Sequence, residues 1–99
     1  MAQDADDEFY DRAHEHLRVA SGQLAGVARG KVSASMMYAS ARLNVWLSAR
    51  DRRTVAELKS VYGETIEYFV AQYRRMLVKN LDDFVDNFDE YREAPKRSS

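Results

Sequence analysis

The side chains of this sequence best suited to metal binding or proton transfer are its two histidines, His14 and His16. On a helix, side chains two residues apart point about 200° away from each other, so these imidazoles do not share one metal ion. Asp11 and His14 have the three-residue spacing of helical carboxylate and histidine metal sites, but such a site needs a second pair, and the pattern occurs once. We therefore expect no metal site, and a surface ion pair or hydrogen bond for His14.

Catalytic chemistry has little support elsewhere in the sequence. The chain contains no Cys, which excludes disulfides, thiolate catalysis and cysteine-ligated zinc. No Gly-rich phosphate-binding loop and no nucleophile motif occurs. We assign no catalytic, cofactor-binding or metal-ligating residue, expect no cofactor, and favour a non-catalytic helical interaction or structural protein over an enzyme.

Arg42 is the one charged residue in the stretch 32–49, although 31% of the whole chain is charged. A stretch so poor in charge predicts a helix that is buried on most of its circumference. Arg42 and Asn44 would then need partners, because an unpaired buried donor costs about 1–3 kcal/mol and an unpaired charge more. Two interpretations remain open. Arg42 pairs with an acid in the core, or it forms an anion pocket with Arg74 or Arg75, as would suit a small helical enzyme.

The net charge of −1 is unevenly distributed along the chain. Residues 1–17 hold one basic and six acidic residues. Residues 18–79 hold eleven basic and four acidic residues, and residues 80–99 hold three basic and six acidic residues. The acidic ends could fold back on the basic middle, or the middle could form a patch for a polyanion. We favour the first interpretation, because nucleic-acid-binding domains usually have a net positive charge.

A basic turn follows the charge-poor stretch, with Arg50, Arg52 and Arg53 close together. A turn between two helices invites comparison with helix-turn-helix proteins. The helix after it begins Thr54-Val55-Ala56-Glu57-Leu58, which offers few side chains that could contact base edges. A nucleic-acid-associated regulator that uses this turn is therefore kept as an alternative, and nucleic acid is not the partner we favour.

Strand signals are weak throughout, and the sequence predicts an all-α, three- to four-helix bundle. A first helix is predicted over residues 5–27, with one apolar face made of Phe9, Ala13, Leu17, Ala20, Leu24 and Val27. A second helix is predicted over residues 33–50, with Ser33 as its N-cap. Its apolar stripe contains Met36, Leu43 and Leu47, and we expect its neighbours to enclose it as the central element.

The third predicted segment begins at Thr54, and Glu57 completes the capping-box pattern. Apolar residues then recur at spacings of three and four over residues 54–90, a helix of roughly 57 Å that the other two cannot cover. Two solutions remain open. The chain breaks near Lys79–Asn80, so that the remainder folds back as a short fourth helix, or the surplus apolar stripe over 62–91 packs on a second copy in a homodimer. We slightly favour the break.

Three stretches carry a resemblance to a known family: Glu8-Phe9-Tyr10-Asp11-Arg12-Ala13, then Gly30-Lys31-Val32-Ser33-Ala34-Ser35-Met36-Met37-Tyr38-Ala39-Ser40-Ala41-Arg42-Leu43-Asn44, then Ile66-Glu67-Tyr68-Phe69-Val70 with Tyr73-Arg74-Arg75-Met76-Leu77 and Asn80-Leu81-Asp82-Asp83. Over about residues 8–89, the chain resembles a family of small proteobacterial all-helical proteins catalogued as a domain of unknown function. The resemblance implies a soluble bacterial protein, and it supplies no activity, ligand or partner.

The expected organisation is a single helical domain over residues 1–93, followed by a disordered tail over 94–99. The first residues are acidic, so no export signal is expected and the cytoplasm is the default compartment. The charge-poor stretch 32–49 is too polar and too short for a membrane span, so we expect no membrane partner.

Overall fold

The computed structural model describes residues 6–91, and every regular element in that range is a helix. The helices in chain order are α1 Phe9–Gln23, α2 Arg29–Arg50, α3 Val55–Ser60, α4 Tyr62–Asp86 and α5 Phe88–Tyr91. The all-α class is confirmed, with a middle helix and a long, broken C-terminal helical segment. The tail expected over 94–99 and the predicted domain end at residue 93 lie outside the described residues.

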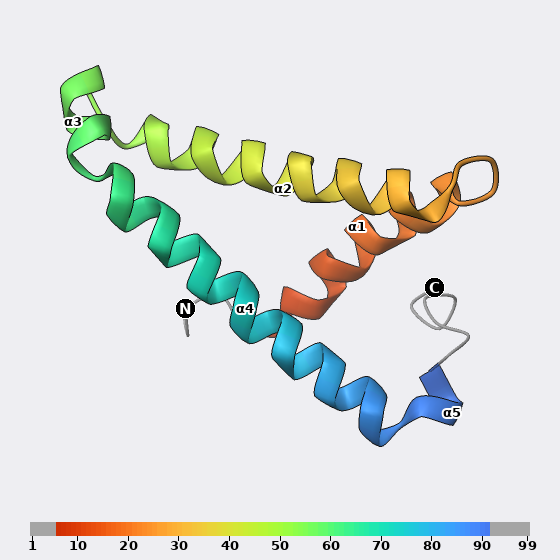
Figure 1. Cartoon of the computed structure of the whole chain (residues 1–99). Helices are drawn as coiled ribbons and strands as arrows, with labels where there is room; N and C mark the ends of the chain where they lie inside the picture. Colours follow the sequence, from red (N-terminus) through yellow and green to blue (C-terminus); the bar gives the residue numbers. More distant parts are fainter. Residues whose placement is uncertain (1–5, 92–99) are drawn as a thin grey trace.

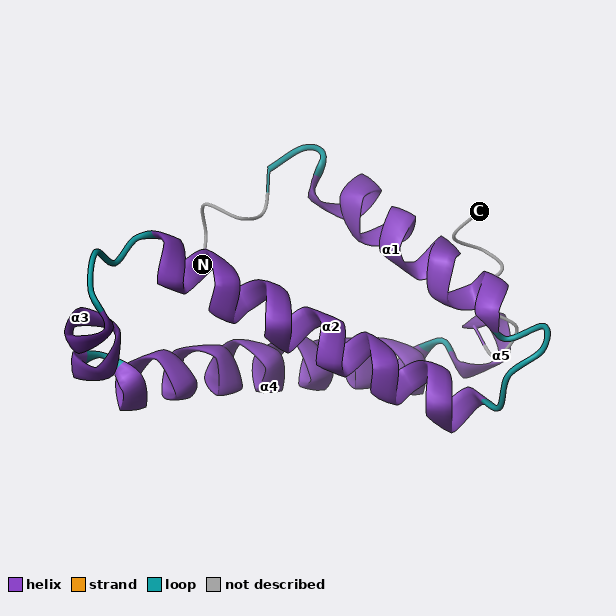
Figure 2. Cartoon of the chain, turned by 90° about the horizontal axis from the view of Figure 1, so that it is seen from above, coloured by secondary structure: helices purple, strands orange, loops and turns teal. Residues whose placement is uncertain are grey.

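The helices form an open frame (Figure 1). α2 and α4 meet at a corner made by α3 and diverge from it, and α1 crosses the open side between them. From above, α1 lies to one side of α2 and α4 (Figure 2). The first turn of α1 reaches the middle of α4, where Lys79 Nζ donates a hydrogen bond of 3.4 Å to the hydroxyl oxygen of Tyr10. The molecule extends over 49 × 30 × 23 Å.

Helix α1 is shorter than the predicted segment 5–27. Its start is held by Asp6, whose carboxylate accepts a hydrogen bond from the Glu8 amide and pairs with Arg12 at 3.1 Å. The helix ends one residue after Gly22, because glycine in a last turn costs about 1 kcal/mol relative to alanine. The N-terminal part of the predicted apolar face is confirmed, since Phe9, Ala13, Leu17 and Ala20 are half-buried. Its last two members, Leu24 and Val27, lie beyond the helix and are exposed.

Helix α2 begins at Arg29, four residues before the predicted N-cap Ser33, so that prediction is wrong. Ala28 is the residue that precedes the helix, and its carbonyl accepts hydrogen bonds from the Lys31 and Val32 amides. Arg and Lys are good helix formers, so the residues before Ser33 continue the helix outward. Across the part of the chain that the structure describes, no helix is both long and apolar enough to traverse a bilayer.

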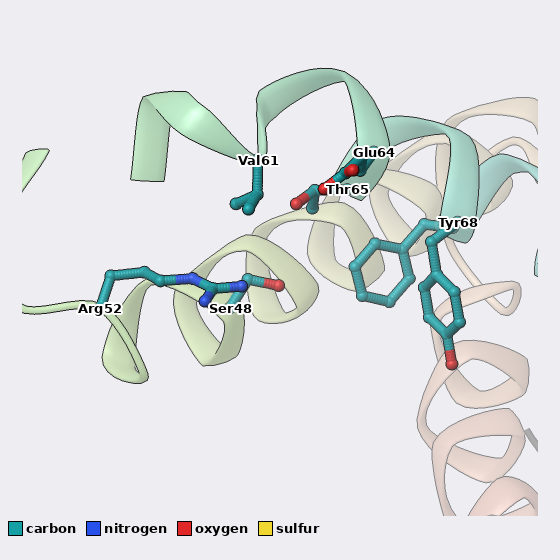
Figure 3. Close-up of a pocket in the computed structure, with 7 residues that line it drawn as sticks. Ser48, Arg52, Val61, Glu64, Thr65 and Tyr68 are labelled. Carbon is teal, nitrogen blue, oxygen red and sulfur yellow. The ribbon is translucent and has the colours of Figure 1, made fainter. Parts of the chain in front are cut away.

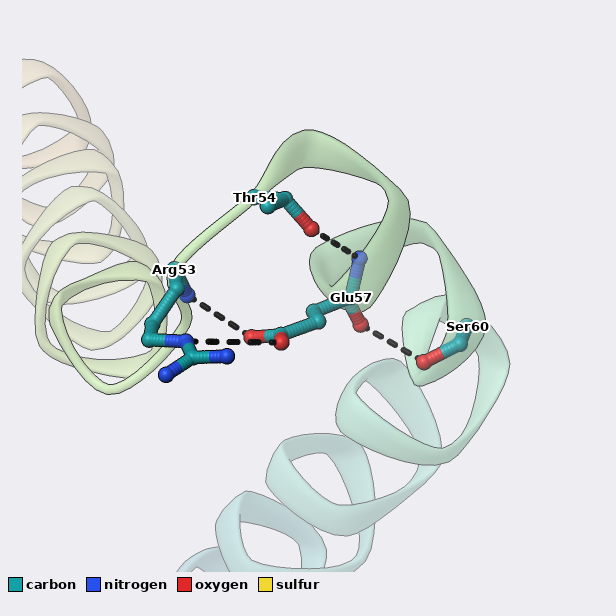
Figure 4. A network of polar contacts seen from close by, with 4 residues as sticks. All are labelled: Arg53, Thr54, Glu57 and Ser60. Carbon is teal, nitrogen blue, oxygen red and sulfur yellow. Dashed lines mark hydrogen bonds and ion pairs between the residues drawn. The ribbon is translucent and has the colours of Figure 1, made fainter.

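The N-cap at Thr54 is confirmed, but Glu57 closes the predicted capping box one residue earlier, on the Arg53 amide (Figure 4). The Glu57 amide donates to Thr54 Oγ1 at 3.1 Å, as an N-cap requires. The Glu57 carboxylate accepts a 2.7 Å hydrogen bond from the Arg53 amide, one residue before the N-cap, and Arg53 Nε lies 4.0 Å from its other oxygen. Ser60 Oγ donates to the Glu57 carbonyl at 2.7 Å. This network fixes the corner between α2 and α4.

The long C-terminal segment breaks at Val61 and at Asn87, and the prediction of a break near Lys79–Asn80 is wrong. Asn80 does not cap a new helix, because its side-chain amide donates to the Met76 carbonyl, 2.7 Å away, inside a continuous α4. The first break follows Ser60, whose hydroxyl bonds a carbonyl of the preceding turn, a contact that bends helices. At the second break, the Asn87 side chain bonds Asp83 in the same way.

The expectation that the middle helix is enclosed by its neighbours is wrong for the single chain. Within residues 6–91, Val32 is the one buried hydrophobic side chain, at 6% exposure, and it lies at the N-terminal end of α2. Further along the helix, Leu43 is 48% exposed and Trp46 is 57% exposed. The reason is geometric. α2 and α4 diverge from the α3 corner, so neither lies along the apolar stripe of the other.

Candidate functional site

The best-defined hollow lies at the corner of the frame, between the end of α2 and the start of α4 (Figure 3). Its volume is about 260 Å³, and it is lined by Ser48, Arg52, Val61, Glu64, Thr65, Tyr68 and Phe69. Glu64 and Thr65 come from the first turns of α4, which the break at Val61 turns over the last turns of α2. The hollow therefore exists because the C-terminal segment breaks where it does.

The polar groups of this corner hollow are one guanidinium, one carboxylate and the three hydroxyls of Ser48, Thr65 and Tyr68. Arg52 and Glu64 are exposed, whereas Ser48 and Thr65 are half-buried. No hydrogen bond links a nucleophile to a base among these residues, and the hollow contains no histidine. The arrangement has the groups to bind a small polar molecule, but it lacks the pairing that activates a nucleophile.

A second hollow of about 550 Å³ lies along α4, and its lining residues all come from that helix: Arg74, Arg75, Val78, Lys79 and Asp82. Arg75 donates a hydrogen bond to Gln72 on the preceding turn. Lys79 donates to Tyr10 of α1. The hollow is a basic concavity on one helix rather than a cleft between elements.

Arg42 is exposed on α2 and does not line either hollow. The two ion pairs between described residues are Arg12–Asp6 and Arg53–Glu57, so Arg42 has no acidic partner there. Asn44 is half-buried. The structure thus does not bring Arg42 together with Arg74 and Arg75, and the burial expected for Arg42 is not found in the single chain.

The three arginines of the basic turn are exposed, but each has a different neighbour. The Arg50 guanidinium lies over the Trp46 ring, 5.1 Å from its centroid, as in a cation–π contact. Arg52 lines the corner hollow, and Arg53 pairs with Glu57.

His14 is half-buried on α1 and His16 is exposed. Between residues 6 and 91, no group of three or more His, Cys, Asp or Glu side chains is arranged to hold a metal ion.

The most extensive feature of the surface is apolar. We define the α4 stripe as Ile66, Val70, Tyr73, Leu77, Leu81 and Phe84, all of them exposed. A second exposed apolar face on α2 contains Met36, Leu43, Trp46 and Leu47. Sequence periodicity identified most of these residues, as a core of the single chain or, for the stripe over 62–91, as a surface for a second copy. Sequence periodicity missed Ser48, Glu64 and Thr65 of the corner hollow. The one sequence signal for this hollow was the run of weak helix formers from Ser60 through Val61 to Gly63.

Comparisons with known proteins match most of this helical frame. A family model described as "Protein of unknown function (DUF3144)" matches residues 9–85, from the start of α1 almost to the end of α4. The NMR structure of the protein NB7890A from Shewanella sp is similar, with a TM-score of 0.73 and 34% sequence identity, and the match covers 90% of this chain and 95% of that chain. No curated protein matches the chain.

Proposed function

The chain belongs to the DUF3144 family of proteins of unknown function, and from that premise we propose that it is a non-catalytic interaction or structural protein. It acts through its helices, whose exposed apolar faces pack against another polypeptide chain. The proposal depends on one observation, the burial of a single hydrophobic side chain, Val32, in the described part of the chain.

A core of one side chain does not hold helices together. Ordering each residue costs about 1–2 kcal/mol in backbone entropy, and burial of apolar surface is the main term that offsets this cost. The chain exposes 8605 Å² to solvent, whereas a compact monomer of 11.4 kDa exposes about 5,800 Å². Its radius of gyration is 16.0 Å, against roughly 13 Å for a compact domain of this length. These values support a chain that completes its core with a partner.

The chemistry of the hollows supports a non-catalytic role. The corner hollow offers exposed Arg52 and Glu64 without an activated nucleophile, and the α4 hollow is a basic concavity on one helix. An anion-binding enzyme site needs its cations to converge on one point. Arg42 lies outside the hollow that Arg74 and Arg75 line.

The test is the dependence of folding on protein concentration. Sedimentation equilibrium gives the mass of the purified chain, and circular dichroism gives its helicity and Tm between about 1 and 100 μM. If assembly completes the core, the mass exceeds 11.4 kDa and Tm rises with concentration. A chain that needs a different partner is poorly helical by itself at every concentration. A helical 11.4 kDa monomer with a cooperative, concentration-independent Tm would contradict the proposal.

A nucleic-acid role is the second candidate, favoured by the exposure of Arg50, Arg52 and Arg53 at one turn. Binding through phosphate contacts would weaken steeply with salt and would be reduced in the double variant Arg52→Glu, Arg53→Glu. Fluorescence anisotropy with labelled DNA and RNA at low salt measures both effects. The matched control is Arg74→Glu with Arg75→Glu, which removes equal charge from α4. No binding at low salt rules this candidate out.

A further inference from the structure

The α4 stripe occupies one narrow sector of its helix. Its members, Ile66, Val70, Tyr73, Leu77, Leu81 and Phe84, are separated by four, three, four, four and three residues. At 100° per residue they fall within about 80° of one another. Every member is exposed, and Leu81 is the most exposed at 63%.

This stripe is not the face that α4 presents to its own chain. The half-buried residues of α4 are Thr65, Phe69 and Gln72, which lie to one side of the stripe around the helix. The contact with α1 uses Lys79, on the face opposite the stripe. Apart from the Phe84 ring, which packs against Tyr91 of α5 with ring centroids 4.8 Å apart, the described part of the chain leaves the stripe uncovered. A continuous apolar stripe of this kind is typical of a helix that packs against another helix.

The spacing of the stripe is symmetric about Leu77. Tyr73 and Val70 precede Leu77 by four and seven residues, and Leu81 and Phe84 follow it by four and seven. The stripe therefore has the same pattern in both directions along the helix. A surface that pairs with an identical surface across a twofold axis has to be self-complementary in this way.

We propose that a second copy of this chain covers the α4 stripe, with the two α4 helices antiparallel and the twofold axis passing beside Leu77. Leu77 then packs on Leu77 of the second copy, Tyr73 on Leu81, and Val70 on Phe84. This inference rests on the proposed function, because it names another copy as the chain that completes the core.

The charges along α4 favour the antiparallel orientation. The end of the helix is acidic, with Asp82, Asp83 and Asp86. These carboxylates lie on the side of α4 away from the stripe, so parallel packing would place the two acidic helix ends at the same level and their repulsion would act across the width of the helix pair. In the antiparallel register about Leu77, they lie level with residues 68–72 of the second copy, which carry no charge. The two helix dipoles are then also antiparallel.

The area that a second copy must cover is of the size that a stable dimer buries. The surface of each chain exceeds that of a compact monomer by roughly 2,800 Å², or about 5,600 Å² for two copies, and obligate homodimers bury from about 2,000 to over 5,000 Å² in total. Covering the stripe on each copy removes part of this excess from water.

Cysteine cross-linking tests the register, because the natural chain has no Cys and each introduced thiol is unique. Under mild oxidation, Leu77→Cys is expected to form a covalent dimer, since the axis brings the two thiols together. Val70→Cys and Phe84→Cys alone are expected to stay uncross-linked, because the two copies of each lie roughly 21 Å apart along the helix pair, beyond the reach of a disulfide. A refolded equimolar mixture of the two is expected to give the mixed disulfide.

The cross-linking pattern distinguishes this proposal from the other arrangements. Cross-linking of Val70→Cys and Phe84→Cys each with itself would mean parallel helices and would overturn the register. A dimer in which neither Leu77→Cys nor the mixed pair cross-links would overturn the use of the stripe, while leaving the proposed function intact. Arg75→Cys, on the opposite face of α4, is the control for random collision.

A pair of charge substitutions tests the interface without oxidation. Leu77 and Val78 are neighbours with nearly equal exposure in the chain, 52% and 48%, but Val78 lies outside the stripe. Leu77→Glu is expected to weaken dimerisation by about a hundredfold or more, since the axis brings two carboxylates together in an apolar interface. Val78→Glu is expected to change it less than about threefold. Equal effects in sedimentation equilibrium would overturn the proposal, and circular dichroism at high concentration checks that both variants fold.

Discussion

At the scale of single residues, most side chains that looked suited to chemistry have local roles. Arg53 and Glu57 secure the start of α3, and Arg50 lies over Trp46. Arg42, which the sequence predicted to be buried and paired, is exposed. A charge on a helix that faces solvent needs no partner, because water already stabilises it. The residue that matters most for the packing of the chain is Val32.

Val32→Ala tests whether this one buried side chain stabilises the fold. We expect a loss of about 2 kcal/mol, because the change removes two buried methyl groups and leaves a cavity. Val45→Ala on the same helix is the matched control, since Val45 is 55% exposed, and we expect it to cost under about 0.5 kcal/mol. Urea unfolding at fixed protein concentration measures both. Equal losses would mean that Val32 and Val45 are covered to the same extent in solution.

Thr54→Ala tests the corner between α2 and α4. The substitution removes the oxygen that accepts the Glu57 amide, so we expect a loss of about 1 kcal/mol. Thr54→Ser keeps that oxygen and should lose far less. Thermal unfolding followed by circular dichroism compares the two variants, and an unchanged Tm for Thr54→Ala would show that the cap does not limit stability.

At the scale of helices, periodicity predicted which segments are helical, but it did not predict where they begin and break. The cap at Thr54 was predicted correctly, because a capping box depends on residues three apart in sequence. The cap at Ser33 and the break at Asn80 were wrong, because both residues are also tolerated inside a helix that its neighbours continue. The break at Val61 follows from a short run of weak helix formers, from Ser60 to Gly63, inside a long apolar pattern.

Gly63→Ala tests the contribution of this weak run. Gly63 is in the first turn of α4, and a Cβ added there would have no neighbour within 4 Å. Alanine should therefore stabilise the chain by about 0.4–1 kcal/mol, mainly by reducing the freedom of the unfolded chain. Urea unfolding measures the change. A destabilised variant would show that something fills that space in solution, as a second chain would.

At the scale of the whole molecule, the chain has the helices of a bundle without the enclosed core of one. The five helices of residues 6–91 form an open frame whose apolar faces on α2 and α4 are exposed. Such faces lower the free energy of the system only when they are removed from water, and the frame itself does not remove them. The proposed antiparallel pairing of α4 would do so in part.

Amide hydrogen exchange tests whether α4 pairs with a second copy in the assembled protein. If α4 pairs with a second copy, exchange in residues 70–84 should slow as protein concentration rises, because dissociation precedes opening. Exchange in α3, which lies at the corner away from the middle of α4, should depend much less on concentration. Mass spectrometry at two concentrations measures both segments. Equal behaviour of α3 and α4 would argue against an interface centred on Leu77.

The sequence by itself determined the helical class, the approximate segments, the apolar faces of α1 and α4, and the cap at Thr54. These features depend on residues a few positions apart, so local propensity and periodicity specify them. Only the tertiary structure decided that α2 and α4 diverge, that Arg42 faces solvent, and that Val32 alone among the described hydrophobic residues is buried. An apolar stripe specifies that a face has to be covered. What covers it depends on the angles between helices, which are set at Val61 and at the α1 to α2 turn, and on surfaces beyond the chain itself.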